Sequence, residues 1–314
     1  MSSQTAPVAC RSLTKVFDGR PVVDDVSFEV PAGTITGFVG ANGAGKTTTM
    51  RMLLGLVAPT AGDALIDGRP YRSLDGPRCR VGAVVDGPGA HPGHTARAHL
   101  GIIATAARLP LSRVGEVLDL VGLAEHAGRR VGGFSTGMRQ RLALAGALLG
   151  DPGVLILDEP ANGLDPPGII WMRDVLAGLA AEGRAVLVSS HLLAELAEVA
   201  DRVVIIDRGR LVADAPLDEL LRAGGTAVEL ACADPGAAAA ALVAAGASVG
   251  RDGDLLVVSA MAAREIGEIV ARAGAGPVHR LAERAARFED AYLALAGSLA
   301  TPPAAPPAGA REAS

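Results

Sequence analysis

The stretch GANGAGKTTT, from Gly40 to Thr49, decides the fold of this chain. It follows an apolar, strand-like run at residues 34–39 (TITGFV) and precedes a helix-like run at residues 50–56. It fits the phosphate-binding pattern G-x-x-x-x-G-K-S/T, which requires a strand before it and a helix after it. Because glycines carry no Cβ, successive backbone N–H groups can converge on phosphate oxygens, and the helix points its positive dipole end at the same anion.

The pattern predicts which groups bind a nucleotide. Lys46 is expected to reach the β- and γ-phosphates, and the Thr47 hydroxyl to ligate Mg²⁺. The loop residues expected to contact the nucleotide are Gly40, Asn42, Gly43, Ala44, Gly45, Lys46, Thr47 and Thr48. The alternative is a plain glycine-rich turn in a chain with 40 glycines. Lys15 and Lys46 are the only lysines among 29 Lys and Arg residues, which argues against a chance lysine at this position.

Composition bounds the class of protein. A length of 314 residues suggests two domains, or one large domain with an appendage, and 49% hydrophobic residues suffice for a core. The net charge of −5 gives no case for nucleic-acid binding. Three widely spaced cysteines (Cys10, Cys79 and Cys232) favour a reducing cytoplasm. No signal peptide and no apolar run of about 18–20 residues is visible, so any work at a membrane would need a partner.

The order of apolar runs predicts an α/β domain with a mostly parallel sheet. Strands joined at Asp18-Gly19 are expected within residues 8–30, and Ser112 is expected to cap a helix. The other expected elements are strands at 64–66, 81–85, 154–157, 185–189 and 203–206, helices at 95–107, 112–121, 136–149 and 168–181, a helix ending at 200, and a linking helix at 215–222. The three helices within residues 95–150 form a helical insertion.

A second, smaller α/β pattern follows the first. Its expected elements are strands at 227–231 and 255–260, an Ala-rich helix between them, a helix at 261–274, a short strand near Val278 and a helix at 287–296. We therefore predict a nucleotide-binding domain at 1–222, a small domain at 223–300 and a disordered Pro/Ala-rich tail at 301–314.

Two carboxylates follow the apolar strand at residues 154–157. Ligands of parallel sheets bind at the carboxyl ends of strands, so these acids should lie near the phosphate loop. Asp158 is expected to hold Mg²⁺, and Glu159 to polarise the attacking water, as in a Walker B motif. Alone this pattern is weak, since many buried strands end in acids; beside a phosphate loop it is strong.

Further segments carry a resemblance to a known family. FSTGM, at residues 134–138, stands where the ATP-binding cassette (ABC) family has LSGGQ, although Ser135 could also simply cap a helix. NGLD, at residues 162–165, matches the D-loop of that family, and His191 matches its switch histidine. Phe17 matches the aromatic residue that stacks on adenine. Taken in order, these matches cover roughly residues 8–215, and VGAVVDGPGAHPGHTARAHL and RFEDAYLALAG resemble drug- and bacitracin-resistance exporters.

The resemblance implies a mechanism and partners. Two cassettes would pair head to tail, with each ATP held between one phosphate loop and Ser135 and Gly137 of the other copy. Asp165, in the matched D-loop, and Asp86 would also contact the nucleotide. Glu159, His191 and Lys46 would be catalytic. The helical insertion and the loop near Asp86 would contact a separately encoded permease, which places the chain on the cytoplasmic face of a bacterial membrane.

The sequence differs from the family pattern in two places, and three other functions are considered beside the exporter subunit. Asp86 stands where the family has glutamine, and it is expected to reach Mg²⁺ or water; Thr136 and Met138 also differ from the signature. A soluble ABC-type ATPase acting on ribosomes or DNA, an importer subunit and a purely regulatory switch protein are the other functions considered. His91, His94 and His99 are expected to be exposed loop residues rather than metal ligands.

Overall fold

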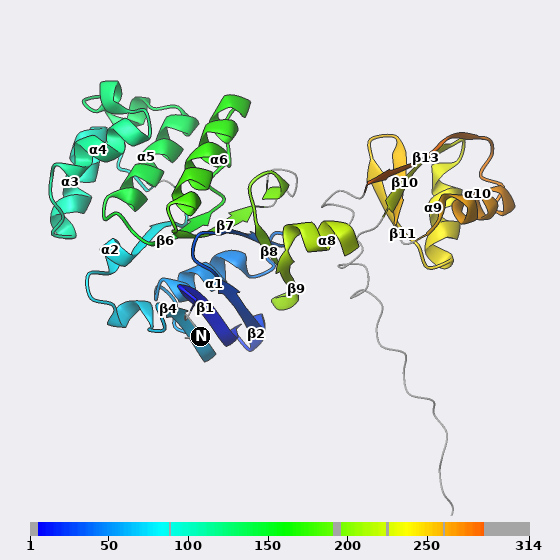
Figure 1. The fold of residues 1–314 in the computed structure, drawn as a ribbon, viewed down its shortest axis with the longest axis horizontal. Helices are drawn as coiled ribbons and strands as arrows, with labels where there is room; N and C mark the ends of the chain where they lie inside the picture. The colour runs from blue at the N-terminus through cyan, green and yellow to red at the C-terminus, as the bar shows by residue number, and fades with distance from the viewer. Residues whose placement is uncertain (1–5, 88, 191–195, 224–225, 260, 286–314) are drawn as a thin grey trace, which may run out of the picture. The chain divides into compact units, whose positions relative to one another are not determined.

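The structure is a computed structural model that describes residues 6–87, 89–190, 196–223, 226–259 and 261–285. The chain has two compact units, Met1–Glu219 and Leu220–Ser314 (Figure 1). The predicted positions of His191, of the helix at 287–296 and of the tail at 301–314 lie outside the described residues.

A six-stranded sheet forms the centre of the first unit, in the order β5-β6-β7-β3-β8-β9. All neighbouring strands are parallel except β8 and β9. Every residue of β3 is buried, as expected for a strand covered on both faces. The strands are β3 (Ile35–Val39), β5 (Val81–Val84), β6 (Val154–Asp158), β7 (Ala185–Ser190), β8 (Arg202–Asp207) and β9 (Arg210–Pro216).

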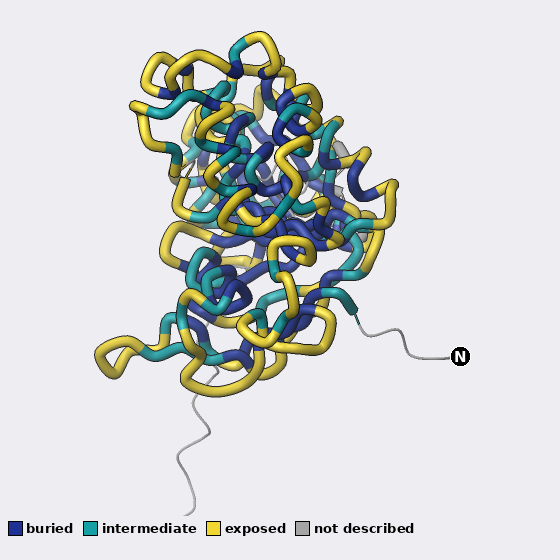
Figure 2. Tube along the Cα trace, turned by 90° about the vertical axis from the view of Figure 1, so that its left-hand side faces the viewer, coloured by how far each residue is buried: buried dark blue, intermediate teal, exposed yellow. Residues whose placement is uncertain are grey.

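A second sheet is antiparallel and packs over helix α1 (Lys46–Leu53), in the order β2-β1-β4. The two sheets and the helix share one core, in which the rings of Phe28 and Phe38 lie 5.2 Å apart. Figure 2 shows this buried layer running through the middle of the unit. The strands are β1 (Val8–Phe17), β2 (Arg20–Val30) and β4 (Ala61–Ile66).

The predicted helical insertion lies at the opposite end of the unit from the antiparallel sheet (Figure 1). Its α-helices are α3 (Ala96–Ala106), α4 (Arg113–Leu120) and α5 (Thr136–Leu148). The prediction of Ser112 as a helix cap is wrong, because its backbone is already helical and its side chain makes no cap bond. Bonds of the i→i+3 type begin at Pro110, so the turn starts before Ser112 and leaves it no extended backbone.

Apart from the long helix α6, the remaining helices that the structure gives with full bounds in the described part of the first unit are short connectors. The connectors are η1 (Tyr71–Ser73), α2 (Pro77–Arg80), η2 (Ala124–His126) and η3 (Val131–Gly133), and the long helix is α6 (Pro166–Ala181). The linking helix predicted from residue 215 starts later, as α8 (Leu217–Ala223). Ala215 and Pro216 instead end strand β9, because the hydrogen bonds of the β8 edge reach that far and decide the conformation.

The second unit is a four-stranded antiparallel sheet covered by two helices, in the order β11-β12-β10-β13. This βαββαβ arrangement is the ferredoxin-like one. Its core includes Val228, Leu230, Leu242 and Ile266. The elements are β10 (Thr226–Cys232), α9 (Pro235–Ala244), β11 (Ser248–Asp252), β12 (Leu255–Ser259), α10 (Ala263–Arg272) and β13 (Val278–Ala285). Within the described residues, no helix combines the length and apolar character that a membrane span requires.

Candidate nucleotide site

The phosphate loop connects β3 to α1, and its glycines are sterically required. A Cβ on Gly40 would lie 2.4 Å from the carbonyl oxygen of Ile206, and one on Gly45 2.7 Å from that of Val22. Gly45 also has φ of 106°, in the left-handed region. Helix α1 begins at Lys46, so the first N–H groups of the helix and its positive dipole end face the loop.

The Lys46 side chain curls over this loop and is 7% exposed. Its ammonium donates hydrogen bonds to the carbonyl oxygens of Gly40, at 2.5 Å, and Ala41, at 3.3 Å. Burial lowers the pKa of Lys46, while the negative charges of Glu159 and Asp158 act in the opposite direction. The loop therefore keeps its one ammonium close to two carboxylates and to the backbone donors.

Asp158, at the end of β6, connects helix α1 and strand β7 at the site. Thr47 Oγ1 donates to Asp158 Oδ2 at 2.7 Å, and Ser189 Oγ donates to Asp158 Oδ1 at 2.6 Å. The backbone N–H of Glu159 donates in turn to Ser189 Oγ at 2.9 Å. Glu159 has φ of 51°, a strained left-handed conformation for a residue with a Cβ. Such strain is found at functional sites, where the surrounding contacts hold the backbone in place.

Ser189 is a site residue that the sequence analysis did not single out. It is fully buried at the end of β7, directly opposite Asp158 in the parallel register of β6 and β7. The sequence could have identified Ser189. A polar residue at the carboxyl end of one strand lies at the same edge of the sheet as acids at the carboxyl end of the neighbouring parallel strand.

The donor set fits magnesium and a triphosphate. Mg²⁺ prefers oxygen ligands and keeps several of its waters, so it needs few ligands from the protein. The Thr47 hydroxyl and the Asp158 carboxylate, which contact each other, supply such oxygens. The Lys46 ammonium and the helix N–H groups suit phosphate oxygens. Among the described residues no group of three His, Cys, Asp or Glu side chains is placed to hold a metal.

Asp86 follows β5 and faces helix α1. Its carboxylate accepts from two of the three side-chain nitrogens of Arg51, at 2.5 Å from Nη2 and 3.2 Å from Nε. The pair raises the pKa of the Arg51 guanidinium, chiefly through this hydrogen bond. Arg51, four residues beyond Thr47 on α1, was not anticipated as a partner. A role of Asp86 toward Mg²⁺ stays a prediction.

Phe17 ends β1 and is 44% exposed, which makes its ring available for stacking. The Lys15 ammonium lies 4.8 Å from the centre of the ring and donates to the carbonyl of Ala58 at 2.8 Å. The Lys15 ammonium lies over the Phe17 ring and helps to orient it. Stacking of the adenine on this ring stays a prediction.

The signature and D-loop segments begin two helices. Ser135 Oγ accepts from the N–H of Met138 at 3.2 Å and caps α5, and Asp165 Oδ1 accepts from that of Gly168 at 3.1 Å and caps α6. A Cβ on Gly137 would lie 3.4 Å from a side-chain carbon of Leu164, so the structure brings the two segments together.

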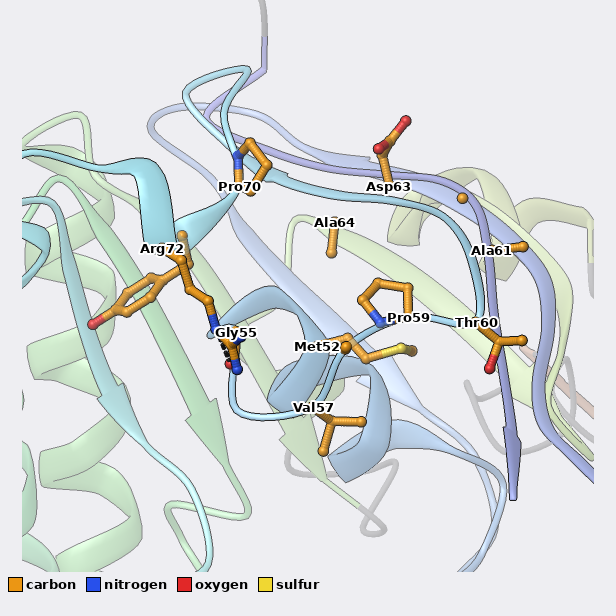
Figure 3. A pocket seen from close by; sticks show the side chains of 13 residues that line it. Met52, Gly55, Val57, Pro59, Thr60, Ala61, Asp63, Ala64, Pro70 and Arg72 are labelled. Atoms are coloured by element: carbon orange, nitrogen blue, oxygen red, sulfur yellow. Dashed lines mark hydrogen bonds between the residues drawn. The ribbon is translucent and has the colours of Figure 1, made fainter. Parts of the chain in front are cut away.

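Among the cavities lined by described residues, two lie away from the phosphate loop. One, of about 300 Å³, is lined by residues around the end of α1, β4 and η1, including Met52, Val57 and Arg72 (Figure 3). None of the predicted site residues lines it. The other, of about 210 Å³, lies between the segment after β5 and the helical insertion, and His99 and Gly87 line it. His99 lies on helix α3 and is half-buried, so its prediction as an exposed loop residue is wrong. Burial, and the neighbouring His94, lower the pKa of His99.

Fold and site together define a phosphate-loop nucleoside-triphosphatase: a parallel sheet whose strand ends carry the loop lysine, the Thr47–Asp158 pair and Glu159. A family model described as ABC transporter matches residues 23–162. The bacitracin transport ATP-binding protein BcrA of Bacillus licheniformis is 42% identical over 225 residues, which cover 71% of this chain and 74% of that protein.

Another relative covers more of the chain. The Nod factor export ATP-binding protein I of Burkholderia orbicola (strain AU 1054) is 35% identical over 93% of this chain and 97% of its own length. A solved ATP-binding subunit of an ABC transporter aligns with a TM-score of 0.63 and 30% identity, over 70% of this chain and 94% of that chain. The chain belongs to the ABC transporter ATP-binding family, which confirms the predicted fold class and the ATPase activity.

Proposed function

We propose that this chain is the ATP-hydrolysing subunit of an exporter that drives a separately encoded membrane permease from the cytoplasmic face of a bacterial membrane. The relatives named for bacitracin transport and Nod factor export support a role in export. The proposed substrate is a drug, an antibiotic or a lipid-like molecule. The observation that carries the proposal is the contact of Thr47 with Asp158, with Glu159 next in the chain, because it joins the phosphate loop to the acids that hydrolysis needs.

Each residue has a proposed task. Lys46 and the first N–H groups of α1 hold the phosphates, and Phe17 stacks on the adenine. Thr47 and Asp158 would hold Mg²⁺, which supplies positive charge against the phosphate oxygens when bound. Glu159 polarises the attacking water, and His191 assists at the γ-phosphate. Asp86 is proposed to contribute near the metal.

Hydrolysis is proposed to need two copies. Ser135 and Gly137 of one copy would complete the site of the other, and Asp165 would lie at that interface. A dimeric ATP-binding cassette with bound ADP and phosphate shares the fold at 23% identity and a TM-score of 0.61. The cavity beside His99 and the Asp86 segment is the proposed contact for the permease. The domain limits at 222 and 300 remain part of this proposal.

The test is Glu159→Gln. Removal of a general base should lower the hydrolysis rate by about 10²–10⁴-fold, while ATP affinity is retained because the phosphate loop is unchanged. The variant should also remain dimeric with ATP on size-exclusion chromatography. Glu182→Gln, an exposed glutamate that pairs with Arg184 away from the site, is the control and should hydrolyse ATP like the wild type. Normal hydrolysis by Glu159→Gln would remove this residue from its proposed role.

A further inference from the structure

The start of helix α5, which carries the signature segment, contacts the D-loop that precedes α6. Gln140 Nε2 donates to the carbonyl of Asn162 at 3.3 Å. A Cβ on Gly163 would lie 2.8 Å from a methyl carbon of Thr136, so only glycine allows this approach. The beginning of α5 and the D-loop are therefore in direct contact.

A second contact lies further along both helices. The guanidinium carbon of Arg141, on α5, lies 3.8 Å from the ring centre of Trp171, on α6. Arg141 Nη1 also donates to the carbonyl of Val121 at 3.1 Å, where α4 ends. Tryptophan is the best aromatic partner for a cation, and a helix C-terminus favours positive charge. Arg141 thus connects three helices, and Trp171 is the only tryptophan in the chain.

We propose that Arg141 and Trp171 are positioning residues that make the signature segment and the D-loop one unit, so that both reach the second copy of the chain in a single arrangement. This proposal rests on the proposed dimeric function. Ser135 and Asp165 begin different helices, and a displacement of about 1 Å between groups that must act together can cost about 100-fold in rate. The stack prevents that displacement, although neither residue touches the nucleotide.

A purely structural role makes a different prediction. A stack that only stabilised the fold would lower the unfolding temperature and ATP affinity together when broken. A positioning role lowers kcat and dimer formation, while ATP affinity is unchanged, because the phosphate loop belongs to other elements.

The test compares full-length Arg141→Met, Trp171→Leu and the double variant, with Trp171→Phe as the conservative replacement. Each single variant should lower kcat about threefold to thirtyfold, the loss expected for one cation–π contact, with ATP affinity within about twofold of wild type. The double variant should be no slower than the slower single variant, and Trp171→Phe should recover most of the rate. In the Glu159→Gln background, the ATP-bound dimer fraction should fall for the same variants.

Arg173→Met is the matched control, because Arg173 also lies on α6 but pairs with the exposed Glu198. It should leave kcat and dimer formation unchanged. Unchanged kcat in Arg141→Met, additive losses in the double variant, or a parallel loss of ATP affinity would overturn the proposal. If Arg141→Met does not fold, Arg141→Lys replaces it, because lysine keeps the charge but loses the planar stack. Arg141→Lys must then lower kcat and dimer formation while ATP affinity stays unchanged. If Glu159→Gln alone forms no dimer with ATP, the proposed function fails, and this inference fails with it.

Discussion

The hydroxyl of Ser189 carries more of the site than its place in the sequence indicates. It donates to Asp158 and accepts from the N–H of Glu159, so one side chain orients both acids. We expect Ser189→Ala to lower kcat about tenfold, since a buried hydrogen bond to a charged group is worth about 1.5–3 kcal/mol. ATP affinity should change little. Steady-state ATPase assays and nucleotide binding measure the two effects.

The control for Ser189 is Ser73→Ala, because the Ser73 hydroxyl is exposed and donates only to the nearby carbonyl of Pro70. It should behave as the wild type. A Ser189→Ala variant that keeps the full rate would show that Asp158 and Glu159 hold their positions without this hydroxyl.

Because of Lys46, the affinity for ATP should fall at alkaline pH. Burial holds its pKa below the ordinary 10.5, so the ammonium that is proposed to bind phosphate is present at neutral pH and is lost as the pH rises through that lowered value. ATP affinity should therefore fall before an exposed lysine would titrate. Lys46→Met should weaken ATP binding about tenfold or more at neutral pH. It should also remove most of the decrease in ATP affinity that the wild type shows at alkaline pH. An unchanged affinity at neutral pH would contradict the role of this ammonium.

At the scale of elements, the strand–loop–helix join tolerates no side chain at Gly40. Its Cβ would lie 2.4 Å from a backbone oxygen of Ile206, and a backbone atom cannot move away as a side-chain end can. We expect Gly40→Ala to cost about 1–3 kcal/mol of unfolding free energy and to weaken ATP binding. Denaturant titration gives the first quantity.

Gly101→Ala is the comparison for Gly40, because Gly101 lies inside α3 with open space around its Cβ position. It should stabilise the protein by about 0.5–1 kcal/mol through helix propensity. Equal effects of the two substitutions would refute the steric argument.

Patterns of apolar residues along the sequence located most helices and strands. They did not locate strands whose conformation depends on hydrogen bonds from an adjacent strand. The strand 154–157 is a continuous apolar run, and it and the helices of the insertion were predicted close to their observed bounds. Strand β9 has exposed and half-buried residues only, and β11 contains Gly250 and Arg251, so neither has a clear pattern. Each of these strands forms because an adjacent strand supplies its hydrogen bonds.

At the scale of the whole molecule, the first unit contains the nucleotide site and the second is a ferredoxin-like sheet with its own core. We expect a chain ended after Leu221 to bind ATP with wild-type affinity. If the second unit strengthens pairing, the shortened Glu159→Gln variant should form less dimer with ATP. Analytical ultracentrifugation measures this, and intact dimerisation with intact transport would dismiss a role of the second unit in pairing.

The sequence by itself determined the phosphate loop, the acids at the end of the 154–157 strand and the order of strands and helices, because spacing along the chain carries that information. Only the tertiary structure decided that Ser189 orients both acids, that Arg51 holds Asp86 and that Arg141 stacks on Trp171. These partners are 30 or more residues apart in the chain. Contacts of this kind follow from which strands and helices lie side by side, which no local pattern encodes.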